Sequence, residues 1–189
     1  MSERMDTLQQ YVSDMLALER HIFEAVKRQT DDDHTKYLPE ATRLIGKIEG
    51  MLGGHISETE QHLSSLGGDS GSPVKDAVAA VTGIAAGLID KVRSNTVSKM
   101  LRDDYAALSL DAMGYTMLHT TGLALQHSPT ADLALRHLYD LTPLIVEISE
   151  VIPLVVAKEL LDDGETVDAS VGPEAVRNTQ KTWKNEVVR

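Results

Sequence analysis

Residues 44–66 read LIGKIEGMLGGHISETEQHLSSL, and this stretch decides the fold that the sequence predicts. Apolar and then ionisable side chains recur in it at steps of three and four residues: Leu44, Ile48, Met51, His55, Glu58, His62 and Leu66. This spacing is typical of one face of an amphipathic helix. Three ionisable residues therefore fall on the inward face of a predicted helix within two turns.

The residues on either side predict a chain that is helical throughout. Periodicity and capping signals predict helices over residues 6–29, 39–66, 73–93, 95–126 and 128–164, with a short helix from about residue 174. Gly67 and Gly68 are suited to the left-handed position that ends a helix. Residues 30–34 are expected to form a solvated turn. Pro143 and Pro153 should kink or break the last long helix.

These elements predict an all-α fold, a four-helix bundle with an extra crossover helix and a short C-terminal helix. We expect residues 1–189 to form one domain, with a bundle core over 6–164. The tail, 165–189, should dock on the bundle through Trp183, the only tryptophan. Elongated bundles of this kind commonly associate as dimers, so a homo-oligomer is expected.

Composition excludes several classes of function. The chain of 189 residues has a formal charge of −11 without a basic stripe, which argues against a nucleic-acid partner. It has no cysteine and hence no disulfide or thiolate site. Its longest apolar run, residues 77–89, is shorter than the ~20 residues that a membrane span requires. No signal peptide is recognised at the N-terminus, so a cytoplasmic protein is expected.

Helix 6–29 places a carboxylate where an apolar residue is expected. Its inward face is Leu8, Val12, Met15, Glu19, Ile22 and Val26. Buried carboxylates and imidazoles from facing helices can bind iron, manganese or zinc, or they can form a hydrogen-bond network without metal. His55 and His62 lie roughly 10 Å apart along a helix axis, so Glu58 can share an ion with either of them but both cannot reach one ion.

The other two long helices leave the remaining ligands open. In helix 95–126 the candidates are Asp104, Asp111 and His119, on two adjacent stripes between which the sequence does not decide. Tyr105 and Tyr115 are expected at the edge of the core. In helix 128–164, Glu147 and Glu150 flank the apolar stripe. His137, near the start of that helix, is interpreted as a surface or hydrogen-bonded residue.

The segment His55-Ile56-Ser57-Glu58-Thr59 resembles the H-x-x-E-T segment of the stress-associated YciF-like bacterial proteins, which have a ferritin-like fold. Leu18-Glu19 within the first helix and Leu101-Arg102-Asp103 in the third extend the resemblance. It implies a ferritin-like bundle with a carboxylate-bridged di-iron centre, in which Glu19 and Glu58 match the carboxylates of the first two helices.

The resemblance also implies that the metal centre is altered or lost. Ferritin-like ligand sets contain Glu-x-x-His motifs, whereas Glu58 is followed three residues later by Gln61, with His62 one residue further on. Gly114-Tyr115-Thr116-Met117 stands where the family has a Glu- and His-rich segment, and the last long helix has Glu147-x-x-Glu150.

Three hypotheses follow from these patterns. The first is a metal-binding bundle that holds iron, or else manganese or zinc, through these candidate ligands: Glu19, His55, Glu58, His62 and Glu147. The second is a non-catalytic scaffold or interaction protein with a degenerate metal site. The third is a four-helix hydrolase or transferase that uses a single metal ion and histidine ligands.

Overall fold

The computed structural model describes residues 3–69 and 96–183, and all regular secondary structure in these two ranges is helical. The helices are α1 (Glu3–Thr30), α2 (Asp33–Lys36), α3 (Pro39–Ser65), α5 (Val97–Ala124), α6 (Ser128–Asp162) and α7 (Val171–Trp183). The all-α prediction is confirmed for this part of the chain. The predicted crossover helix, residues 73–93, lies outside the described residues.

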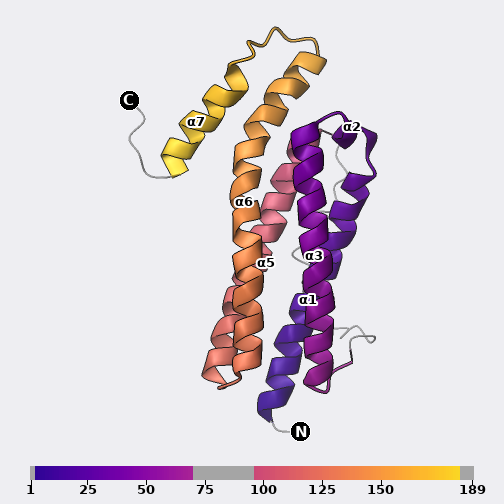
Figure 1. Cartoon of the computed structure of the whole chain (residues 1–189), viewed down its shortest axis with the longest axis vertical. Helices are drawn as coiled ribbons and strands as arrows, with labels where there is room; N and C mark the ends of the chain where they lie inside the picture. The colour runs from indigo at the N-terminus through magenta and orange to yellow at the C-terminus, as the bar shows by residue number, and fades with distance from the viewer. Residues whose placement is uncertain (1–2, 70–95, 184–189) are drawn as a thin grey trace.

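The four long helices lie side by side around one core (Figure 1). Helix α1 contacts α3 and α5, and α6 completes the arrangement by contacting the same two helices. Neighbouring helices run in opposite directions, so α3 and α5 are parallel to each other. The end of α3 and the start of α5 are therefore at opposite ends of the bundle.

The core forms because each long helix has an apolar stripe that meets the stripes of its neighbours. Its fully buried residues come from all four helices and include Leu8, Ile22, Leu44, Ile48, Leu52, Leu101, Leu108, Tyr115, Leu118, Leu141 and Ile148. Burying a side chain of this size stabilises the fold by about 1.5–3 kcal/mol. The core thus surrounds any polar side chain that shares these stripes.

Glycine lets the helices approach closely at two places. A Cβ atom on Gly114 would lie 2.5 Å from Sδ of Met15, which packs from α1 into the space beside α5. A Cβ atom on Gly122 would lie 2.6 Å from the backbone N of Ala131 in α6. The close packing of α5 and α6 near their connecting turn depends on Gly122, because a larger side chain there would push the two helices apart.

The helix boundaries correct several sequence predictions. Helix α1 begins at Glu3, three residues before the predicted start at residue 6. The expected turn over residues 30–34 contains the start of α2, because the Asp32 side chain accepts a hydrogen bond from the backbone N–H of His34 and caps it. Gly67 adopts the expected left-handed conformation, with φ of 83°.

Helix α6 is continuous across both of its internal prolines. It runs from Ser128 to Asp162 with Pro143 and Pro153 inside it, so the alternative of a broken helix is wrong. Each proline removes one hydrogen-bond donor, and the packing of α6 against α3 and α5 maintains the helix. The chain then turns at Gly164, where φ is 89°.

The C-terminal helix α7 begins at Val171, three residues before the predicted start near residue 174, and includes Gly172 and Pro173. It packs along α6, where Gln180 donates a hydrogen bond to Oγ of Ser149 at 3.2 Å. Trp183 contacts the ring of Tyr105 edge-on, with 6.0 Å between centroids, and remains 59% exposed.

Candidate metal centre

Three buried ionisable side chains from three helices meet in the middle of the bundle. They are Glu19 of α1, His55 of α3 and His137 of α6, and each is at most 4% exposed. One carboxylate oxygen of Glu19 and one ring nitrogen of each histidine lie within 4.8 Å of one another. We call these three residues the buried cluster.

Helical periodicity places these residues in the core. Glu19 lies four residues after Met15 and three before Ile22, both of which are buried. His137 lies four residues before Leu141, which is fully buried. In a helix, residues three or four apart share a face, so the apolar neighbours bring the polar side chains inward with them.

The two imidazoles stack on each other, with centroids 3.8 Å apart and an angle of 3° between the rings. Nδ1 of His55 lies 3.2 Å from Oε1 of Glu19, so its N–H donates to the carboxylate. Nδ1 of His137 lies 2.7 Å from the hydroxyl of Tyr115, and its Nε2 lies 3.4 Å from Oε2 of Glu58. Because the Glu58 carboxylate only accepts, the proton of His137 belongs on Nε2 and Tyr115 donates to Nδ1.

Burial keeps His137 uncharged at neutral pH. Loss of hydration on burial and, to a lesser degree, the neighbouring His55 lower the pKa of His137 to about 4. Metal ions bind the neutral form of imidazole, so no proton has to leave His137 before it can coordinate. His137 is therefore already in the neutral form that binds a metal ion.

A second carboxyl group lies beside Glu19. Asp111 of α5 is fully buried, and burial raises its pKa well above the ordinary value, with the Glu19 carboxylate raising it further. The same two acidic groups, after burial itself, raise the pKa of the Tyr115 hydroxyl. The interior at this level of the bundle thus has an excess of acidic groups, and no lysine or arginine is buried within residues 3–69 and 96–183.

Several of these buried atoms have no hydrogen-bond partner within the described parts of the chain: Glu19 Oε2, His55 Nε2 and both carboxyl oxygens of Asp111. A buried polar group without a partner costs about 1–3 kcal/mol, and a charged group costs more. Three such side chains in one part of the core therefore destabilise the fold unless a further group binds there.

The structure separates the other predicted ligands from the buried cluster. Glu58 lies at the surface beside it, 52% exposed, where Arg136 donates to it at 3.1 Å and lowers its pKa. His62 lies further along α3, with Nε2 at 2.8 Å from Oγ1 of Thr130. Glu147 accepts two hydrogen bonds of 2.8 Å from Lys47 at the surface. Of the five predicted ligands, only Glu19 and His55 belong to the buried cluster.

The structure decides between the two candidate stripes of α5. Asp104, Asp111 and Tyr115 are buried, whereas His119 is partly exposed, with Nδ1 at 2.8 Å from the carbonyl oxygen of Ala131. Asp104 lies apart from the buried cluster and accepts a hydrogen bond of 2.8 Å from Gln29.

His137 is the ligand that the sequence interpretation missed. The fully buried apolar positions on either side of it in α6 are Ala134 and Leu141. These two residues lie three before and four after His137, so the spacing alone contained a signal for its burial.

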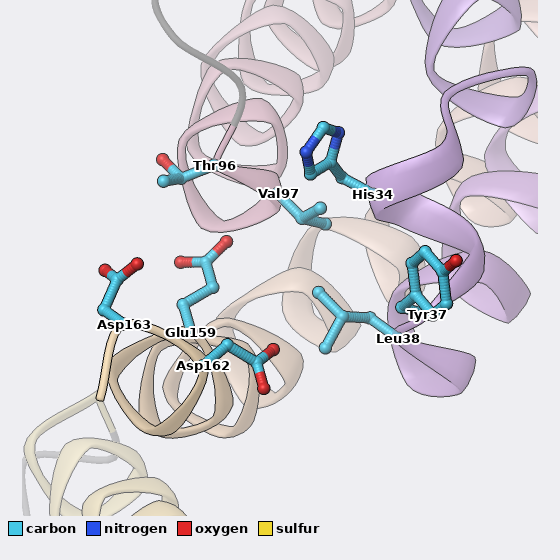
Figure 2. Close-up of a pocket in the computed structure, with 8 residues that line it drawn as sticks. All are labelled: His34, Tyr37, Leu38, Thr96, Val97, Glu159, Asp162 and Asp163. Carbon is cyan, nitrogen blue, oxygen red and sulfur yellow. The ribbon is translucent and has the colours of Figure 1, made fainter. Parts of the chain in front are cut away.

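A surface hollow lies at the end of the bundle where α6 ends (Figure 2). It has a volume of about 530 Å³, and carboxylates of α6 reach into it from one side. Glu159 accepts hydrogen bonds from the backbone N–H and the hydroxyl of Ser98, at 2.9 and 2.5 Å, and so caps α5. The charge of Glu159 is thus already used within the fold, and this hollow is a weaker candidate than the buried cluster.

No protein-family model, curated protein or solved structure matches this chain. Among the described residues, no helix combines the length and apolar character that a membrane crossing requires. The function therefore has to be inferred from the side chains of the buried cluster.

Proposed function

We propose that the protein binds a divalent first-row transition-metal ion at Glu19, His55 and His137, with ferrous iron as the first candidate and manganese or zinc as alternatives. The observation that supports this most strongly is Oε2 of Glu19, which is buried beside two stacked imidazoles and has no hydrogen-bond partner in the part of the chain that the structure describes. A cation bound there gives the carboxylate its missing partner without any change in the fold.

The donor set fits such an ion. Metal–ligand distances of about 2.1 Å place neighbouring donor atoms about 3.0–3.4 Å apart. The distance of 3.2 Å between Glu19 Oε1 and His55 Nδ1 already has this value, and the third donor lies within 4.8 Å. Two histidines with one carboxylate and free positions are the donors of non-haem ferrous sites, and a bound iron would supply Lewis-acid and one-electron chemistry.

The surrounding residues would hold the ligands in place. Asp140 lies 3.6 Å from Nε2 of His55, so it can accept the ring proton when Nδ1 binds the metal. A carboxylate that holds the second nitrogen of a ligating histidine in this way orients the ring and strengthens its donation. Asp111, beside Glu19, can contribute a further carboxylate.

We also propose that the bundle is ferritin-like. Ferritin-like folds join their second and third long helices by one long crossover, and the parallel course of α3 and α5 requires a connection of that kind. The donors differ from the usual pattern, because the motifs are His55-x-x-Glu58 on α3 and His137-x-x-Asp140 on α6. The order of acid and histidine is the reverse of Glu-x-x-His.

The test is anaerobic titration of untagged protein with Fe²⁺, followed by elemental analysis after gel filtration. We expect about one tightly bound iron per chain. Glu19→Gln should weaken binding by more than the roughly 10- to 100-fold that is typical for loss of an outer partner. Glu147→Gln is the matched control, since Glu147 pairs with Lys47 at the surface, and it should leave affinity unchanged.

A metal-free scaffold is the second candidate. It is favoured by the bonds that already join the helices in pairs, from His55 to Glu19 and from Tyr115 to His137. In that case no Fe²⁺, Mn²⁺ or Zn²⁺ binds above background, and Glu19→Gln changes stability alone. That result would refute metal binding and assign the polar interior to packing specificity.

A further inference from the structure

The surface between α3 and α6 is hollowed directly over the buried cluster. A cavity of about 400 Å³ lies there, lined by Gly50, Gly54, His55, Glu58, Asp140 and Pro143 among others. Gly46, Gly50 and Gly54 form one stripe of α3, and a Cβ atom on any of them would meet nothing within 4 Å. We call this hollow the α3/α6 groove, and it leads from solvent to the edge of His55.

Two matching motifs face each other across this groove. His55-x-x-Glu58 on α3 and His137-x-x-Asp140 on α6 lie on antiparallel helices, so each histidine meets the acid of the other motif. Nε2 of His55 lies 3.6 Å from Oδ2 of Asp140, and Nε2 of His137 lies 3.4 Å from Oε2 of Glu58. Both carboxylates are more than half exposed.

The two crossed pairs are not equivalent. His137 donates its Nε2 proton to Glu58, whereas the proton of His55 lies on Nδ1 and is donated to Glu19. Nε2 of His55 is buried, faces Asp140 and has no hydrogen-bond partner among the described residues. In the neutral ring that binds metal ions this nitrogen carries a lone pair, and a cation between the lone pair and the Asp140 carboxylate binds both.

We propose that the α3/α6 groove contains an outer divalent-cation site, formed by His55 Nε2 and Asp140 with Glu58 beside them, through which ions reach the buried cluster. This inference rests on the proposed function, since it assigns the path by which the buried cluster is filled. Glu19, which holds the opposite nitrogen of His55, orients the ring for the outer ion as well.

Two cationic side chains lie at this surface: Lys47 lines the groove and pairs with Glu147, and Arg136 pairs with Glu58. The guanidinium of Arg136 donates to Glu58 at 3.1 Å and is 59% exposed, so it can move into solvent when an ion arrives. The net charge of the chain and the two groove carboxylates attract divalent cations towards the groove. The outer site therefore governs the rate of filling, while the buried cluster governs the final affinity.

The experiment measures uptake of Co²⁺ by stopped-flow visible absorption under anaerobic conditions, with final stoichiometry from equilibrium titration. Asp140→Asn should slow uptake by about tenfold, because it removes both a ligand and the local attraction. Asp162→Asn is the matched control: it makes the same change on the same helix, outside the groove, and should leave the rate within twofold. Asp162→Asn should bind Co²⁺ with the affinity of the parent protein, whereas Asp140→Asn, which also removes the acceptor for the His55 ring proton, should bind it about 10- to 100-fold more weakly.

A second pair of variants tests the path independently of charge. Gly54→Leu fills the groove, whereas Gly46→Leu adds the same side chain to open space outside its lining. We expect only Gly54→Leu to slow uptake. If Asp140→Asn and Gly54→Leu fill as fast as their controls, the outer site is refuted while the buried cluster stands. If the parent protein takes up no Co²⁺, the proposed function fails as well.

Discussion

Asp104 provides the sharpest test of the electrostatics of the bundle, because it is ionisable, buried and outside the candidate centre. Asp104 is 3% exposed, and Gln29 is the only hydrogen-bond donor to its carboxyl among the described residues. Burial, and to a lesser degree the charge of Asp103, raises its pKa from 3.8 to about 7. Between pH 4 and about 7, Asp104 is therefore mainly protonated in the folded protein and mainly ionised in the unfolded chain.

The size and sign of the effect follow from this difference in pKa. Because the folded pKa is the higher one, the contribution of Asp104 to stability is fully present below pH 3.8 and is lost as the pH rises to about 7. At 1.36 kcal/mol per pKa unit, the loss is about 2 kcal/mol by pH 5 and about 4 kcal/mol by pH 8. Asp104→Asn keeps the acceptor for Gln29 and cannot ionise, so it should avoid this loss.

The assay is urea unfolding of the parent protein and of Asp104→Asn at pH 4, 5 and 8. The free energy of unfolding of the variant should rise relative to that of the parent protein as the pH increases, and the difference should be greatest at pH 8. Asp103→Asn makes the same substitution one residue away, at a position that pairs with Arg102 near the surface, and should give no comparable trend. An advantage of Asp104→Asn that is the same at all three pH values would refute the assignment of a raised pKa.

Two further predictions concern packing. Tyr115→Phe removes the donor to Nδ1 of His137 and should lower the free energy of unfolding by about 1–3 kcal/mol, measured by urea titration; an unchanged stability would show that this bond is not formed. Gly122→Ala should lower the thermal unfolding temperature, because its Cβ would lie 2.6 Å from the backbone of Ala131, at a cost of about 1–3 kcal/mol. Gly50→Ala, in open space, should instead stabilise by about 0.5–1 kcal/mol, and equal effects of the two alanines would contradict the helix spacing described above.

Local sequence signals predicted the helices well because periodicity and caps act within a few residues. The stretch around Leu44 and Ile48 predicted a helix with a buried face, and α3 has that face. The same signals predicted Glu19 and His55 on inward faces, where the structure places both. In each case the apolar neighbours three and four residues away determine which way the side chain points.

The second half of α3 shows where local signals fail. After His55 the sequence permits a step of three to Glu58 or a step of four to Thr59, and only the second residue is buried. The packing partner on α6 decides between them, and its position is not encoded within α3. The same ambiguity hid His137, whose burial follows from the register of α6 against α3 and not from a local motif.

Four side chains of the candidate centre come from two helical hairpins that are far apart in sequence. Glu19 and His55 belong to the pair α1 and α3, while Tyr115 and His137 belong to the pair α5 and α6, which share the most extensive contact among the described helices. Hairpins with such local contacts form early in folding, and the docking of two hairpins comes later. The polar cluster is therefore completed only in that last step, and each hairpin on its own leaves its polar groups in water.

The buried cluster therefore connects the two halves of the bundle. An ion held by residues of both hairpins would stabilise the docked state without affecting either hairpin alone. It would slow the separation of the halves and leave the formation of each hairpin unchanged. Glu19, fully buried at the junction, also penalises any docking in another register, because the misplaced carboxylate would be buried without histidines beside it.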